Sequence, residues 1–444
     1  MQTFRWMVVA SAVCLTACAP AISSSGGSIT KLEQERAANP SSEPVLRSLG
    51  IAYFKANRFD DARTALRQAV SLDSNDGVAA LYLGLTAEAQ NDLAAARSAY
   101  ESYLSVGKTR SVKSQITARL AVIARKETEA SAKQAIAQER QLAAVPGPAT
   151  TVAVMPFRFT GRDTSLKPLE RGFADLVTTD LSRVSALKVL DREHLQAVLD
   201  EINLQQSAGA QTGGVRAGKI LQAGSLVGGS ISQIGTDRLN ASAIVTNVQS
   251  TAQVGTGATD QQPLDQIFTL EKNLVLKLLI DNLKVVPTTA ERNAIEQRPT
   301  RSLAAFLAYS RGLEAEDQGR FDDASRFYDN ALRLDPGFGR AQQKSTETKN
   351  IVTGNAVTVS SVEAGLQGTS EGAAVAAATG ATTTEGATNA AAAIADGLNP
   401  SVAGAATSGN TTAATPPTQD ASSGTGADNP STRTGRVTVI VRKP

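Results

Sequence analysis

The feature that most constrains the fold is a pattern of small and apolar residues that recurs along the chain. Ala62 and Ala96 occupy equivalent places in two copies that lie 34 residues apart. The pentapeptide RFDDA occurs at 58–62 and again at 320–324. Such periodicity is typical of repeats in which each unit is one supersecondary motif that stacks on its neighbours. The pattern therefore predicts helical repeats at both ends of the chain, separated by something different.

The repeat resembles the tetratricopeptide repeat (TPR), with units at 43–76 and 77–110. The positions that carry the resemblance are Leu49, Gly50, Tyr53, Asn57, Phe59, Ala62, Leu66 and Ala69, then Leu83, Gly84, Ala87, Asn91, Leu93, Ala96 and Tyr100. A long helical pattern after them predicts a capping helix that ends the module at 142. If the module binds a partner, repeat geometry points to the inward polar residues Arg47, Lys55 and Glu88 as the binding residues.

A third TPR unit is predicted at 301–340, around the second RFDDA sequence. A single repeat cannot bury its apolar face alone. We therefore expect this unit to dock on the N-terminal pair, on the central block or on another copy of the protein.

The N-terminus has the pattern of a signal peptide over residues 1–17, with Arg5 before an apolar run that is too short to span a bilayer. Leu15, Thr16, Ala17 and Cys18 follow the run and resemble the bacterial lipobox, in which the cysteine thiol receives the lipid. The alternative is an ordinary signal peptide with a chance cysteine. The lipoprotein interpretation places the chain at the outer membrane, facing the periplasm, with 18–40 as a flexible tether.

The stretch between the repeats, 150–285, has the pattern of an α/β block. At 187–208 a short β-rich run stops at Asp191, a good helix N-cap, and apolar residues then recur at helical spacing. The run 151–157 is typical of a buried strand. Two strands at 225–234 and 239–248 are predicted to pair through a tight turn. The order of elements predicts an α+β fold in which helices flank a mixed sheet.

At these residues the block resembles the CsgG family, named for the curli secretion channel. The matching stretches are VAVMPF, LKVLDREHLQAVLDEINLQQSA and AGKILQAGSLVGGSIS. Arg192 and Glu201 fall in the family's helix pattern, where we expect salt bridging and capping rather than ligand binding. The channel member inserts long hairpins that form its pore, whereas the connections here are too short for them. The resemblance therefore implies a relative without a pore, like the lipoproteins that activate peptidoglycan synthases or accompany flagella.

No residue pattern indicates an enzyme, a cofactor or a metal site. The one histidine, His194, has no second histidine or cysteine near it, because both cysteines precede residue 20. Gly213–Lys219 nearly spells a phosphate loop, but Ile220 replaces the residue that would bind Mg²⁺. A net charge of +2, with no basic block, gives no electrostatic case for nucleic acid.

The C-terminal region is Ala/Gly/Thr-rich and has few large apolar residues, which predicts disorder over 350–435. The run RVTVIVR at 436–442 is an exception that either adds as a strand to a sheet edge or is a frayed apolar end.

These observations favour a non-enzymatic lipoprotein that acts as a scaffold or adaptor in cell-envelope assembly. Its expected partners are the membrane, through the lipid anchor, and envelope proteins such as a peptidoglycan synthase or flagellar or export machinery; homo-oligomers are possible and nucleic acid is not expected. The alternative function is a ring-forming component of a curli-like secretion apparatus.

Overall fold

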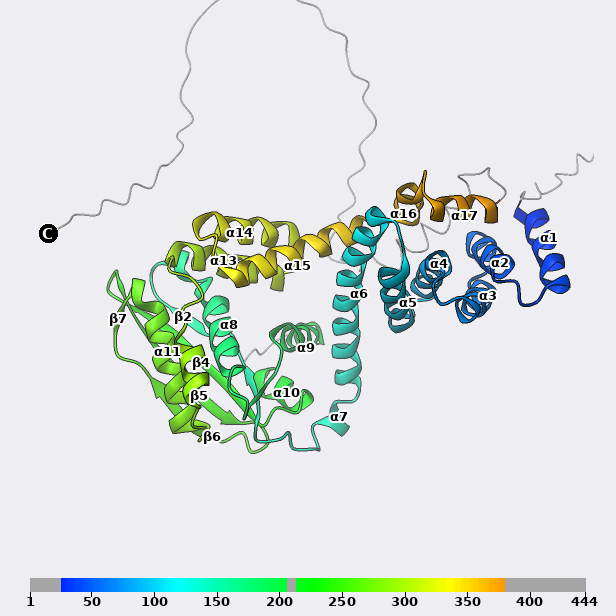
Figure 1. Cartoon of the computed structure of the whole chain (residues 1–444). Coiled ribbons are helices and arrows are strands. Elements are labelled where there is room, and N and C mark those ends of the chain that lie inside the picture. The colour runs from blue at the N-terminus through cyan, green and yellow to red at the C-terminus, as the bar shows by residue number, and fades with distance from the viewer. Residues whose placement is uncertain (1–24, 206–212, 380–444) are drawn as a thin grey trace, which may run out of the picture. The chain divides into compact units, whose positions relative to one another are not determined.

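The structure is a computed structural model that describes residues 25–205 and 213–379 (Figure 1). The lipobox, residues 206–212 and the predicted strand at 436–442 lie outside the described residues.

The N-terminal part is a run of antiparallel helices. Its elements are α1 (Ser25–Ala38), α2 (Glu43–Lys55), α3 (Phe59–Leu72), α4 (Gly77–Ala89), α5 (Leu93–Val106), α6 (Arg110–Ala137) and α7 (Glu139–Leu142). The turns inside the two repeats need a left-handed residue, and Asn57 and Asn91 supply it with φ values of 58° and 57°. Helix α1 packs on α2, so part of the expected tether is folded: the side chain of Ile29 belongs to the apolar core of the repeats.

The central block is a mixed sheet with helices on both faces. Its strands are β1 (Thr151–Val154), β2 (Arg158–Thr160), β3 (Lys188–Val189), β4 (Ser225–Ile234), β5 (Arg238–Asn247), β6 (Gln253–Ala258) and β7 (Gln262–Pro263), in the order β3-β1-β4-β5-β6, with β2 beside β4 and β7 beside β5. Strands β1 and β3 are parallel, whereas β4, β5 and β6 run antiparallel. The hairpin between β4 and β5 turns at Gly235, whose φ is +68°. The predicted mixed sheet is confirmed.

Alternation along β1 places the helices on the two faces. Val152 and Val154 face the core formed with α8 (Leu169–Leu181) and α11 (Ile267–Lys277). Ala153 faces the other way, toward α9 (Arg192–Gln205), α10 (Gly213–Ile220) and the end of α6. Short helical turns complete the block: η1 (Thr164–Leu166), η2 (Leu264–Gln266), η3 (Leu278–Asn282) and α12 (Thr289–Glu296).

The predicted third TPR unit forms a pair of helices that docks inside this chain. Helix α13 (Leu303–Asp317) packs on α8, followed by α14 (Phe321–Leu334) and α15 (Gly339–Ala356), and α15 packs along α6. The unit thus contacts the central block through α13, and α15, the helix that follows the unit, packs along the capping helix of the N-terminal repeats. Of the three expected docking places, the structure uses the central block and the N-terminal module (Figure 1).

Disorder from residue 350 was expected, and this part of the prediction is wrong as far as 379. Helix α15 continues to Ala356, and α16 (Val359–Leu366) and α17 (Ser370–Thr379) follow it. Both helices pack against the N-terminal repeats, where Val359, Val362 and Leu366 are buried. The few apolar residues of this stretch are spaced to bury against an existing helical surface, which composition alone does not reveal.

Within residues 25–205 and 213–379, every helix falls short of the length and apolar character that crossing a membrane requires.

Candidate functional site

The three residues expected to bind a partner through the TPR module are all engaged within the chain. Arg47 Nη1 lies 3.0 Å from Glu43 and 2.9 Å from Asp76, the N-cap of α4, so it joins α2 to the start of α4. Lys55 Nζ lies 3.1 Å from the Glu363 carboxylate on α16. Repeat geometry identified the inward positions, but it could not show that the chain's own helices fill the space before them.

Glu88 is buried in a polar cluster at the end of the N-terminal module. Its carboxylate lies 2.8 Å from Arg119 Nε on α6 and accepts a hydrogen bond of 2.8 Å from the Tyr100 hydroxyl. The Arg119 side chain is only 2% exposed, and its Nη1 donates to the carbonyl oxygen of Gly354 at 2.9 Å. Arg119 therefore joins the second repeat to the end of α15, and Glu88 has a structural role.

A network of charged side chains forms where the third TPR unit meets the central block. Asp175 on α8 is 3% exposed and accepts a hydrogen bond from the Tyr309 hydroxyl at 2.9 Å. Arg340 Nη2 on α15 donates to its other carboxylate oxygen at 2.7 Å. A carboxylate at this depth is stable only when it is paired and hydrogen-bonded, and two helices of the third unit supply that pairing.

Asp317, the last residue of α13, makes the second link of this network. Its carboxylate lies 2.9 Å from Arg171 Nε on α8 and pairs with Arg192, the first residue of α9. Burial disfavours the charged form of Arg192, but the nearby carboxylates of Asp317, Glu316 and Asp175 outweigh it and raise the pKa of the guanidinium. Arg192 is thus a salt-bridging residue, as the sequence indicated.

Lys344 on α15 completes the network with three carboxylates. It pairs with Glu193 on α9, and its Nζ lies 3.0 Å from Glu316 and 3.2 Å from Glu347. Burial opposes the charge on Lys344, but these three carboxylates raise the pKa of its ammonium group. Burial also disfavours the charged form of Glu316, and it therefore raises the pKa of that carboxyl group.

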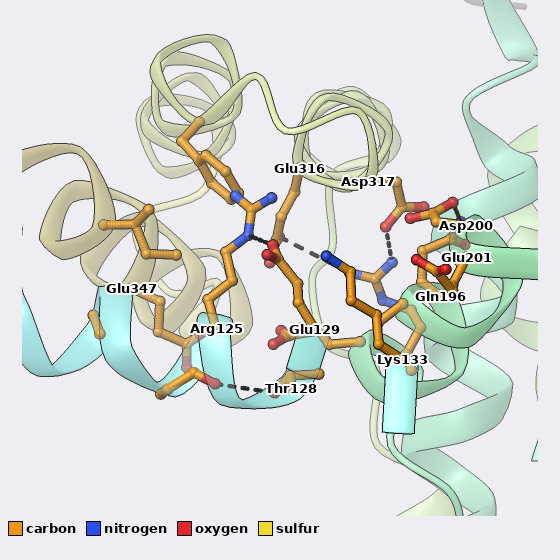
Figure 2. Close-up of a pocket in the computed structure, with 17 residues that line it drawn as sticks. Arg125, Thr128, Glu129, Lys133, Gln196, Asp200, Glu201, Glu316, Asp317 and Glu347 are labelled. Carbon is orange, nitrogen blue, oxygen red and sulfur yellow. Dashed lines mark hydrogen bonds and ion pairs between the residues drawn. The ribbon is translucent and has the colours of Figure 1, made fainter. Parts of the chain in front are cut away.

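A cavity of about 490 Å³ opens beside this network, between α6, α9 and the helices of the third unit. Figure 2 shows side chains from α6, α9 and α13 arranged around one space, with Asp317 on the side of Asp200 and Glu316 on the side of Arg125. Arg125 lies on its wall, where its guanidinium stacks 4.2 Å from the centre of the Phe321 ring and its Nε bonds to Glu129 at 2.7 Å. Carboxylates outnumber cations in the lining, but most of them are already paired with Arg125, Arg192 or Lys344.

A metal site would need several ligand side chains close together. In the described ranges, no group of three or more His, Cys, Asp and Glu side chains is placed to hold a metal ion. His194 lies in the first turn of α9, whose backbone N–H groups are capped by Asp191, and its Nε2 is 3.5 Å from the Ser131 hydroxyl. Gly213–Ile220 is a helix, so the phosphate-loop-like sequence forms no loop there.

Sequence reasoning missed most residues of the network, among them Asp175, Asp317, Arg340 and Lys344. Arg192 was the one member that the family pattern identified. Asp317 had a detectable signal, because it precedes RFDDA of the third unit by the same three residues as Lys55 precedes RFDDA of the first. Asp317 has the opposite charge to Lys55, which indicates that the two positions make different contacts but does not identify the partner of Asp317. The other three residues gave no signal of this kind.

Comparison with known proteins supports both parts of the architecture. Residues 47–110 match a family model described as tetratricopeptide repeat, and residues 128–268 match one described as curli production assembly/transport component CsgG. Among solved structures, the chain is similar to the LpoB C-terminal domain from Salmonella enterica, with 11% identity, a TM-score of 0.22, and coverage of 29% of this chain and 92% of that chain. No curated protein sequence matches the chain. The chain therefore joins tetratricopeptide repeats to a CsgG domain.

Proposed function

We propose that this protein is an outer-membrane-anchored, periplasm-facing lipoprotein that acts as a non-enzymatic adaptor in cell-envelope assembly. TPR units serve protein–protein interaction, and the CsgG family is named for an assembly and transport component. The observation that carries the proposal is the buried network at Asp175, Asp317 and Lys344, which joins the third TPR unit to the CsgG domain.

This network supports an adaptor because it connects two modules through buried charged side chains, among them Asp175, Asp317 and Lys344. Breaking one partner of a buried pair leaves an uncompensated charge, which is costly. A partner held by the TPR module would therefore be coupled to the CsgG domain through α6, α13 and α15, which contact one another or the domain directly. Envelope proteins such as a peptidoglycan synthase, flagellar parts or export machinery are the proposed partners.

The lipid anchor is tested by fractionating cells that produce the Cys18→Ser variant. We expect the variant to leave the outer-membrane fraction, because the thiol is the proposed attachment point of the lipid. Cys14→Ser is the matched control, since Cys14 lacks the lipobox context, and it should stay with the membrane. Full retention of Cys18→Ser in the membrane would exclude the anchor.

The adaptor role is tested by crosslinking intact envelopes and isolating the protein with its neighbours. Recovery of envelope proteins that are lost in an Asp317→Ala variant would support the role. A native mass spectrum of the chain without residues 1–17 distinguishes the adaptor from a ring-forming export component. A monomer or dimer agrees with an adaptor, whereas a large closed oligomer contradicts it.

A further inference from the structure

Helices α16 and α17 return to the N-terminal repeats after the third unit has docked elsewhere. In Figure 1 they lie beside α6, α4 and α2, although more than 200 residues separate them from these helices along the chain. We call residues 359–379 the return segment, and the surface formed by α2, α4, the end of α5 and the residues that lead into α6 the TPR groove. The return segment occupies this groove.

The apolar contact between the return segment and the TPR groove involves few side chains. Val359, Val362, Leu366 and Val375 share one buried core with residues of the repeats. Most other residues of the segment are Ala, Gly, Ser or Thr. Because apolar burial stabilises in proportion to area, these few side chains hold the segment less firmly than the helices of the repeats hold one another.

The polar contacts have one predominant direction. Apart from the contact between the Thr109 and Thr369 hydroxyls, in which either oxygen can donate, each hydrogen bond that the structure gives between the groove and the return segment is donated by the groove and accepted by the segment. Glu363 is one focus: it lies 3.1 Å from Lys55 Nζ and accepts from the Tyr82 hydroxyl at 2.6 Å. Without the segment, the groove would present an ammonium group and hydroxyl donors.

Glu371 is the second focus and lies at the start of α6. It accepts the backbone N–H groups of Lys108 and Thr109 at 3.0 Å each, and also the Tyr103 hydroxyl at 3.3 Å and the Thr109 hydroxyl. Both N–H groups lie just before the first residue of α6, Arg110, and the partial positive charge of a helix N-terminus favours a carboxylate there. Gly77 leaves the room for it, because a Cβ there would lie 2.8 Å from Glu371 Oε1.

These observations specify the chemistry of a ligand. We propose that the TPR groove binds an acidic helical segment of a partner protein, and that residues 359–379 occupy the groove in cis and compete with that partner. The inference rests on the proposed adaptor function and names the partner's chemistry: small apolar side chains with carboxylates placed for Lys55 and for the start of α6. The cis contact keeps the groove closed until such a partner displaces it.

The test uses a chain with a cleavage site for a sequence-specific protease inserted between Val357 and Thr358, in the turn that joins α15 to α16. The chain folds intact, and cleavage then leaves the return segment held by non-covalent contacts alone. The probe is a fluorescently labelled synthetic peptide of residues 358–379. We expect the peptide to enter the groove of the cleaved protein, measured by anisotropy, and to bind the uncleaved protein at least about tenfold more weakly, because the tethered segment competes.

Two variants test the acidic character of the ligand. A peptide carrying Glu363→Gln and Glu371→Gln should bind about tenfold or more weakly, since it loses charge-assisted hydrogen bonds at both ends. Lys55→Met in the protein should weaken the original peptide but not one carrying Glu363→Gln, which isolates that pair.

Three outcomes would overturn the proposal: no exchange of the peptide after cleavage, equal binding of the acidic and amide peptides, or a dimer of the uncleaved chain that exchanges return segments. The last would assign the groove to a second copy. None of these depends on the lipid anchor or on envelope partners, so failure here would leave the adaptor function standing. Failure of the Cys18→Ser or crosslinking experiments would likewise leave the peptide result intact.

Discussion

The first and third TPR units share a backbone design but use it to hold different things. Asn57 and Gly319 take the same left-handed conformation before RFDDA, with φ values of 58° and 70°. Three residues before the arginine of that motif, the first unit has Lys55 and the third has Asp317. Lys55 pairs with the return segment, whereas Asp317 pairs with the CsgG domain. The repeat motif thus determines the helical hairpin, and the charge at this one position determines what the hairpin holds.

The two units also differ where each of them contacts the helix that follows it. The first unit has the ionic trio Glu43, Arg47 and Asp76 there. The equivalent places in the third unit are Ala305, Tyr309 and Phe338, and the two rings lie 4.9 Å apart. One contact is therefore charged and partly exposed, and the other is aromatic and buried. The difference predicts unequal responses to substitution and to pH.

The largest contrast is expected between Asp317→Ala and Lys55→Ala. Asp317 is 7% exposed, and its loss leaves Arg171 and Arg192 without their main partner, so unfolding should become easier by about 3–5 kcal/mol. Loss of Lys55, which is 16% exposed, should cost about 1 kcal/mol, because Glu363 keeps the Tyr82 hydroxyl. Urea unfolding measures both values. Arg326→Ala, at a side chain that is 76% exposed, is the control. Equal costs for the two variants would contradict the assignment of different roles.

A smaller effect, equal in both units, is expected where the motif itself is changed. A Cβ at Gly50 would lie 2.5 Å from Leu66 Cγ, and one at Gly312 would lie 2.4 Å from a carbon of the Tyr328 ring. Alanine at either position should therefore cost about 1–3 kcal/mol through overpacking. Gly339→Ala is the matched control, because no atom lies within 4 Å of the added Cβ. Thermal unfolding of the three variants tests this, and a clear difference between the first two would mean that the units do not share one packing design.

The two units also show which features of the structure could be predicted from the sequence. Small residues such as Gly50, Gly312 and Ala62 carry the repeat, because close helix packing admits few alternatives, and the repeat units and the mixed sheet could be predicted from such patterns. The contact at Asp175 and Lys344 could not be predicted, because the sequence does not show whether a charged residue on a helix is covered by water or by another helix. The return segment was missed for a related reason. Its Ala/Gly/Ser composition cannot build a core, but it can complete one.

The last prediction concerns pH and the ionic trio of the first unit. Burial and the neighbouring carboxyl of Asp76 raise the pKa of Glu43 to about 8, against an ordinary value of 4.5, although Arg47 acts in the opposite direction. Between about pH 4.5 and 8 the folded chain therefore keeps a proton on Glu43 that the unfolded chain has lost. Stability linked to this group is present below about pH 4.5 and declines as the pH rises through that window.

Glu43→Gln removes this titration while keeping the shape of the side chain. The variant should have nearly the melting temperature of the wild type at about pH 5, and it should be the more stable of the two by a few degrees at about pH 9. The third unit has Ala305 at the same place, so that position adds no such dependence. Glu35→Gln on α1, where the side chain is 44% exposed, makes the same chemical change on an open helix surface. A gap between Glu43→Gln and wild type that stays constant with pH would mean that Glu43 is ionised in the folded chain, and the first contact would then resemble an ordinary surface salt bridge rather than a shared-proton pair.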